Sequence, residues 1–178
     1  KRQDDANLRN MMQKRCMEET RLGIPMIFGH DVIHGYRTIA PVPLAQAASW
    51  NPDLVRTISR DAAKEAYYGG LDWTFSPMVD IARDPRWGRV MEGYGEDPYL
   101  TSVFCKAAVE GYQGDDLSAE GSIAACLKHF VGYGASEAGR DYVYTEISDQ
   151  ALWDTYLPSF HAGVESGAAT VMSAFNNI

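Results

Sequence analysis

The chain has 178 residues and a formal net charge of −8, from 16 lysines and arginines against 24 aspartates and glutamates. Its 46% hydrophobic and 11% aromatic content is typical of a globular domain and excludes a wholly disordered chain. The acidic balance argues against nucleic acid as a partner, because phosphate binding needs a basic face. No apolar run approaches the ~18 residues of a membrane span, so we expect no membrane insertion.

Four helices are predicted. The spacing of apolar residues indicates a first helix over residues 4–20. The segment Asn-Pro-Asp at 51–53 predicts the start of a second helix that ends near Tyr68, because asparagine caps free amides and proline suits the first turn. Two more helices are expected, over 97–114 and 148–167.

Short apolar runs between these helices predict four strands, at residues 25–29, 71–76, 123–130 and 169–174. The third run is apolar without alternation, which is typical of a strand covered on both faces in a parallel sheet. Helices that alternate with parallel strands indicate an α/β fold. The remaining segments, including 30–49, are predicted loops.

Two α/β architectures compete. A doubly wound open sheet often carries a glycine-rich phosphate turn, and none follows a predicted strand here. A (β/α)8 TIM-type barrel places its chemistry at the carboxyl ends of its strands, and polar residues of this chain gather there. We therefore predict a partial (β/α)8 barrel with about half of the barrel present.

Candidate site residues follow the predicted strands. Asp31 either accepts hydrogen bonds from a polar ligand or only caps loop amides. His30 and His34 lie in a loop rather than on a helix, so we expect no metal site there. Lys128 and His129 end a buried strand, and neighbouring strand residues point to opposite faces. A shared pocket for both requires a departure from regular β geometry.

An arginine-rich segment, 83–89, follows the second predicted strand. Acidic residues succeed it at once, so we expect an ion-pair scaffold in which at most one arginine contacts a ligand. Arg140 and Asp141 lie in a later loop, where solvated charge is the default. Sugar cleavage usually needs two carboxyl groups, and no convincing pair is evident in the 178 residues.

Four ordered motifs carry a family resemblance; they occupy residues 30–35, 83–98, 128–134 and 171–176. Together they resemble the amino-terminal domain of glycoside hydrolase family 3, especially bacterial periplasmic β-glucosidases. The resemblance covers essentially the whole chain. It implies that residues 1–178 are a fragment of the family's N-terminal (β/α)8 domain.

The resemblance also implies a retaining, exo-acting hydrolase of terminal β-linked sugars. Its nucleophilic aspartate and the acid/base glutamate of a following domain are expected beyond residue 178, so no catalytic residue is assigned within the chain. By the same resemblance, five residues are expected to bind the sugar: Asp31, Arg89, Lys128, His129 and, as a weaker match, Arg140. No cofactor and no metal are expected.

The expected partners are a β-glucoside or β-linked oligosaccharide and the following domain of the full-length chain. A β-xylosidase, another exo-β-glycosidase of the family, or an inactive sugar-binding fragment are the alternatives. A periplasmic or secreted location rests on the resemblance only.

Overall fold

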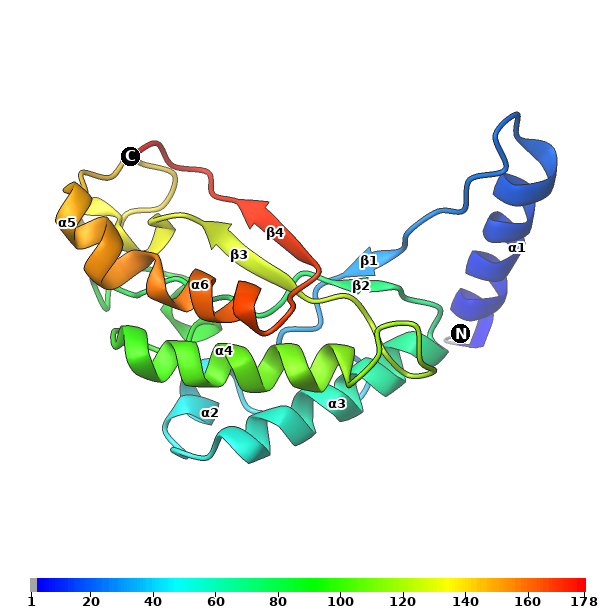
Figure 1. Cartoon of the computed structure of the whole chain (residues 1–178), viewed down its shortest axis with the longest axis horizontal. Helices are drawn as coiled ribbons and strands as arrows, with labels where there is room; N and C mark the ends of the chain where they lie inside the picture. Colours follow the sequence, from blue (N-terminus) through cyan, green and yellow to red (C-terminus); the bar gives the residue numbers. More distant parts are fainter. Residues whose placement is uncertain (1–2) are drawn as a thin grey trace.

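The computed structural model describes residues 3–178, and side chains from residue 6 onward. The helices and strands follow one another along the chain as shown in Figure 1: α1 (Gln3–Glu19), β1 (Gly29–His30), α2 (Pro43–Ala47), α3 (Pro52–Tyr68), β2 (Trp73–Thr74), α4 (Pro98–Gln113), β3 (Cys126–Phe130), α5 (Asp149–Ala151), α6 (Pro158–Glu165) and β4 (Thr170–Ser173). Short turns of other helix types complete the fold: η1 (Val90–Glu92), η2 (Tyr133–Ala135), η3 (Glu137–Gly139) and the π-helical η4 (Leu152–Tyr156). Among the described helices, none is both long and apolar enough to cross a bilayer.

The four strands are parallel and lie side by side in chain order. β1 pairs with β2, and β3 pairs with β4. Two isolated parallel bridges, Trp73 with Ala124 and Met78 with Lys128, connect the two pairs. The prediction of an α/β fold with parallel strands is therefore confirmed, and the carboxyl ends of all four strands meet at one edge.

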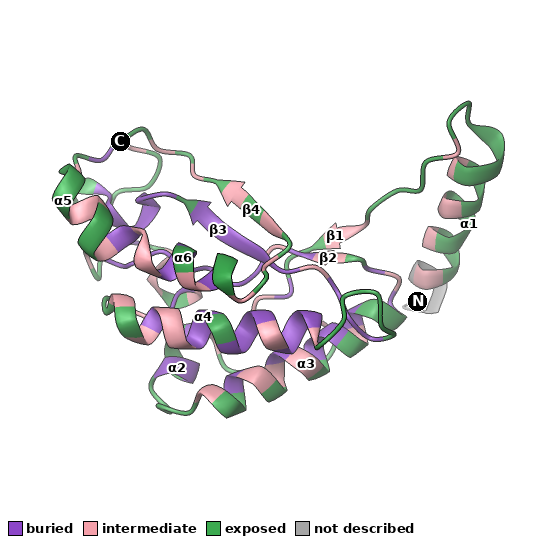
Figure 2. Cartoon of the chain, viewed as in Figure 1, coloured by how far each residue is buried: buried purple, intermediate pink, exposed green. Residues whose placement is uncertain are grey.

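Three helices cover one side of these strands. Figure 1 shows α3, α4 and α6 together on that side, and Figure 2 shows buried residues along α3 and α4. The apolar side chains of these helices and of β3 form one buried cluster, which includes Val55, Ala63, Phe104, Ala108 and Leu127. Burial of this apolar surface is the main stabilising contribution in the fold.

The two long helices of this layer begin where the sequence predicts. The side chain of Asn51 accepts a hydrogen bond from the amide of Leu54 at 3.1 Å, and that of Asp97 accepts one from Leu100 at 2.6 Å. A proline follows each cap, where its missing N–H costs nothing. The predictions for α3 and α4 are confirmed, as is that for α1.

All four predicted strands are longer than the observed ones, and the first two differ most. β1 begins at Gly29, at the end of the predicted run 25–29, and β2 has only two residues, Trp73 and Thr74. The apolar residues Met26 and Ile27 are exposed and no ladder partner faces them among the described residues. An apolar run indicates burial, but a strand also needs a neighbour for its backbone groups.

Two helical predictions also need correction. The predicted loop 30–49 contains the short helix α2. The predicted single helix 148–167 divides into α5, the π-helical turn η4 and α6. Pro158 lies at the junction, and proline cannot donate the N–H that a continuous helix requires.

Candidate functional site

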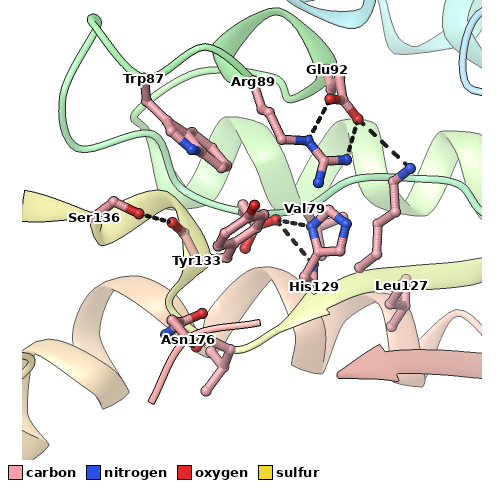
Figure 3. A network of polar contacts seen from close by, with 12 residues as sticks. Val79, Trp87, Arg89, Glu92, Leu127, His129, Tyr133, Ser136 and Asn176 are labelled. Atoms are coloured by element: carbon pink, nitrogen blue, oxygen red, sulfur yellow. Dashed lines mark hydrogen bonds and ion pairs between the residues drawn. The ribbon is translucent and has the colours of Figure 1, made fainter. Parts of the chain in front are cut away.

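Charged side chains from three separate segments meet at the carboxyl edge of the strands. Asp31 follows β1, Arg89 and Glu92 lie in the long connection after β2, and Lys128 and His129 belong to β3. Figure 3 shows Arg89 and Glu92 on the same side of β3 as His129 and Tyr133. We call the group Asp31, Arg89, Glu92, Lys128 and His129 the rim cluster.

Lys128 is the most buried cation of the rim cluster, with 2% of its surface exposed. Its Nζ lies 2.8 Å from Oδ2 of Asp31 and 3.7 Å from Oε2 of Glu92. A buried ammonium is tolerated only when opposite charges replace its hydration, and these two carboxylates do so. The side chain of Asp31 is 44% exposed, so it is accessible to a ligand from solvent.

Asp31 caps its loop, as one of the two roles considered for it requires, and it also pairs with Lys128. Its Oδ2 accepts the hydrogen bond from Lys128, and its Oδ1 accepts one from the amide of Ile33 at 3.2 Å. The loop cap and the ion pair therefore coexist, and together they hold the carboxylate in one orientation.

His129 has a separate carboxylate partner, Asp80. The Oδ2 atom of Asp80 lies 2.8 Å from Nδ1 of His129 and accepts a second hydrogen bond from its backbone N–H at 3.0 Å. Both residues are buried. The other oxygen of Asp80, Oδ1, is buried and has no hydrogen-bond partner among the described residues.

The backbone between Lys128 and Phe130 departs from a regular strand. The register with β4 shifts between these residues, so that Lys128 pairs with Met172 and Phe130 with Ser173, and the Lys128–His129 peptide bond is cis. The predicted departure from regular β geometry is confirmed.

Arg89 and Glu92 form a two-pronged ion pair. Nε and Nη2 of the guanidinium lie 2.6 and 2.7 Å from the two carboxylate oxygens. Burial alone would raise the pKa of Glu92, but the hydrogen bonds from Arg89 and the charges of Arg89, Lys128 and His129 outweigh it, and the pKa is lowered. The hydrogen bond to Glu92 raises the pKa of Arg89, so the pair stays ionised at neutral pH.

Tyr133 connects this ion pair with His129. The guanidinium carbon of Arg89 lies 5.5 Å from the centroid of the Tyr133 ring, and the His129 ring meets it edge-on at 5.0 Å. The hydroxyl of Tyr133 donates a hydrogen bond to Asp141, and Nε1 of Trp87 lies 3.4 Å from the same oxygen. Burial, with the hydrogen bond to Asp141, raises the pKa of Tyr133 to about 12, so the hydroxyl remains a donor.

An open aromatic surface borders the rim cluster. Phe175 and Tyr142 are 65% and 70% exposed, and their ring centroids lie 5.3 Å apart. Phe175 also lies 5.8 Å from Tyr133. Exposed aromatic rings beside polar groups provide a surface on which the apolar face of a ligand can stack.

Arg140 lies outside the rim cluster. Its side chain is exposed, and its Nε donates to the carbonyl of Glu137 at 3.4 Å. The other two arginines of segment 83–89 also form ion pairs. Arg86 pairs with Asp84 of the same segment at 2.6 Å, and Arg83 pairs with Glu137 of η3 at 3.6 Å. The expected ion-pair scaffold is confirmed, with Arg89 alone of the three in the rim cluster.

Within the described residues, no group of three or more His, Cys, Asp or Glu side chains is arranged to hold a metal ion. His34 instead contacts the carbonyl of Ala40 through Nδ1 at 3.0 Å. In the rim cluster, each basic side chain has a carboxylate partner, so positive charge is compensated. Such a site suits a neutral ligand with many hydroxyl groups better than an anion.

Sequence reasoning assigned no role in the site to four residues that support it: Asp80, Glu92, Tyr133 and Asp141. Asp80 follows an apolar run, which was a weak signal for a strand end. Glu92 was interpreted only as part of an acidic run, and Asp141 as solvated charge. No local pattern indicates that a tyrosine or an aspartate will bond to a residue in another segment.

The sequence of this chain is similar to those of known proteins. A family model described as "Glycosyl hydrolase family 3 N terminal domain" matches residues 1–178. A periplasmic beta-glucosidase of Salmonella typhimurium is 45% identical over 94% of this chain and 22% of its own length. A beta-xylosidase of Formosa agariphila is 36% identical over 94% of this chain and 25% of its own length.

Solved structures are similar as well. A mutant beta-glucosidase from Listeria innocua in complex with laminaribiose superposes with a TM-score of 0.95 and 47% sequence identity, over 97% of this chain and 24% of that one. The chain thus spans about a quarter of the length of the relatives that it matches.

Proposed function

The chain belongs to glycosyl hydrolase family 3 as its N-terminal domain, and from this premise we propose that it is part of a retaining, exo-acting β-glucosidase. The substrate is a β-glucoside or β-linked oligosaccharide with a terminal β-D-glucosyl residue. The names of the relatives from Salmonella and Listeria support this substrate class, and the former supports a periplasmic location.

In this proposal, residues 1–178 form about half of a (β/α)8 barrel. Four parallel strands in chain order, with helices on one side, support it. β1 and β4 are only partly covered, as edge strands of an open half would be. The rest of the barrel and the following domain then supply the nucleophilic aspartate and the acid/base glutamate.

The rim cluster is the glycone-binding part of the pocket. The observation that carries this assignment is the network that joins Asp31, Lys128, Glu92 and Arg89 at one strand edge. A lysine has three N–H groups and an arginine five, so both can donate to sugar hydroxyls while they remain paired. Charge-assisted hydrogen bonds are about twice as strong as neutral ones. Arg140, which has no contact with the network, stays a prediction from the family resemblance alone.

The direct test compares hydrolysis of aryl β-glucosides and aryl β-xylosides by the full-length protein and by residues 1–178. We expect the full-length protein to cleave the glucoside faster, with retained anomeric configuration, and the 178-residue chain to be inactive. Activity of the 178-residue chain would show that the nucleophile lies within it. Faster cleavage of the xyloside would favour a β-xylosidase, the activity named for the Formosa relative.

The second candidate is a sugar-binding module whose catalytic partner domain is lost; it predicts that the natural protein containing the module binds glucose without hydrolysing any aryl glycoside. Calorimetric titration with glucose beside the hydrolysis assay distinguishes the two.

A further inference from the structure

Asp80 is a buried carboxylate without a role in the ion pairs of the rim cluster. It is 2% exposed, and its hydrogen bonds go to the backbone and side chain of a single residue, His129. We propose that Asp80 is a positioning residue: it fixes the ring of His129 and determines which ring nitrogen faces the ligand. The inference rests on the proposed function, because it concerns the same site.

The hydrogen-bond chemistry of Oδ2 sets the state of the ring. This oxygen accepts the backbone N–H of His129, so it acts as an acceptor. A carboxylate oxygen has no proton to give, so Nδ1, at 2.8 Å from the same oxygen, carries a proton and donates it. Nε2 is consequently the ring nitrogen left for a ligand hydroxyl.

The burial of Asp80 favours this role over a purely structural one. A buried carboxylate costs free energy unless its oxygens are hydrogen-bonded, and Oδ1 of Asp80 has no partner in the part of the chain that the structure describes. A residue selected only for packing would be apolar at this position. The two hydrogen bonds that Asp80 Oδ2 accepts from His129 explain why a carboxylate occupies this position.

The rest of the site is arranged so that His129 depends on Asp80 alone for its orientation by hydrogen bonds. Lys128, its neighbour in the chain, pairs with Asp31 and Glu92 instead. The His129 ring also packs against two aromatic rings, edge-on to Tyr133 and tilted against Phe175 with centroids 6.4 Å apart. These contacts restrict the ring plane but do not distinguish one nitrogen from the other.

A double-mutant cycle in the full-length protein tests the proposal. We compare kcat and KM on an aryl β-glucoside for three variants: Asp80→Asn, His129→Ala and the double variant. We expect Asp80→Asn to lower kcat/KM about 10–100-fold, as removal of the outer partner of a metal-bound histidine typically does. The loss should fall mainly on kcat, because orientation matters most in the transition state. In the His129→Ala background, Asp80→Asn should change kcat/KM less than about 2-fold.

Equal losses in both backgrounds would overturn the proposal, because a structural carboxylate would act independently of His129. Asp84→Asn is the matched control: Asp84 lies in the same connection, pairs with Arg86 and should leave kcat/KM unchanged. If Asp80→Asn does not fold, the cycle is repeated with Asp80→Ser. Failure of both to fold, while His129→Ala folds, would also overturn the proposal. An inactive wild-type protein would contradict the proposed function itself, which separates the two failures.

Discussion

The helical layer and the rim cluster are stabilised in opposite ways. Where α3 and α4 meet, the buried part of the contact is mainly small and apolar, with the partly exposed Arg56–Glu110 ion pair beside it, and a Cβ added at Gly111 would lie 2.5 Å from the carbonyl oxygen of Arg56. In the rim cluster, buried Lys128 and His129 each depend on a carboxylate from a different segment. The layer therefore contributes mainly to stability, and we propose that the rim serves ligand binding. Substitutions in the layer should change unfolding and leave activity intact, whereas substitutions in the rim should lower activity and, where they leave a buried charge without its partner, stability as well.

The largest effect is expected for Asp31→Asn in the full-length protein. The amide keeps the shape of the side chain but removes the charge that pairs with Lys128 and is offered to the ligand. We expect a loss of about 2–4 kcal/mol of transition-state stabilisation, measured as kcat/KM on an aryl β-glucoside. The midpoint of thermal unfolding should also fall, because buried Lys128 then keeps only Glu92, at 3.7 Å, as a charged partner. An unchanged kcat/KM would remove Asp31 from the site.

Gly111→Ala is the corresponding test in the helical layer. The added methyl group meets backbone of α3, which cannot move aside like the end of a side chain. We expect a destabilisation of about 1–3 kcal/mol, seen as a lower unfolding midpoint, with kcat/KM unchanged. Gly88→Ala is the control, since an added Cβ there meets no atom within 4 Å. Equal midpoints for the two variants would contradict the close approach of α3 and α4.

A smaller effect is expected from Asn51→Ala, which removes the cap of α3. The amide of Leu54 loses its 3.1 Å hydrogen bond, and such a loss typically costs about 1 kcal/mol. Urea unfolding of the full-length protein, monitored by circular dichroism, measures it. Asn10→Ala in α1, an exposed position that is not a cap, provides the comparison and should not destabilise the protein.

The smallest effect concerns pH. The pKa of Glu92 is lowered in the folded protein, so its contribution to stability is present above its usual pKa of 4.5 and is lost as pH falls through the lower folded value. In Glu92→Gln this contribution is missing. The difference in unfolding midpoint between wild type and variant should therefore shrink as the pH is lowered from 6 towards ~3. A difference that grows on acidification would show that Glu92 is not held ionised by Arg89 and Lys128.

The long helices were accessible from local signals, whereas the candidate binding residues were predicted from the family resemblance. The caps Asn51 and Asp97 act within three residues, so the starts of α3 and α4 could be predicted. The strands could not be bounded, because a strand ends where its neighbour ends. β2 is short for that reason, although the apolar run around it is longer.

By itself, the sequence determined the α/β alternation and the family, through the order of its motifs and the residue types at the strand ends. Only the tertiary structure decided which of those residues meet. It joins Lys128 to Asp31 across 97 positions and His129 to Asp80 across 49, and it leaves Arg140 exposed beside Glu137. The physical reason is the distance along the chain over which each interaction acts. Capping and periodicity act within a few residues, whereas a buried charge pairs with a group that packing brings close, however far apart the two residues lie in the sequence.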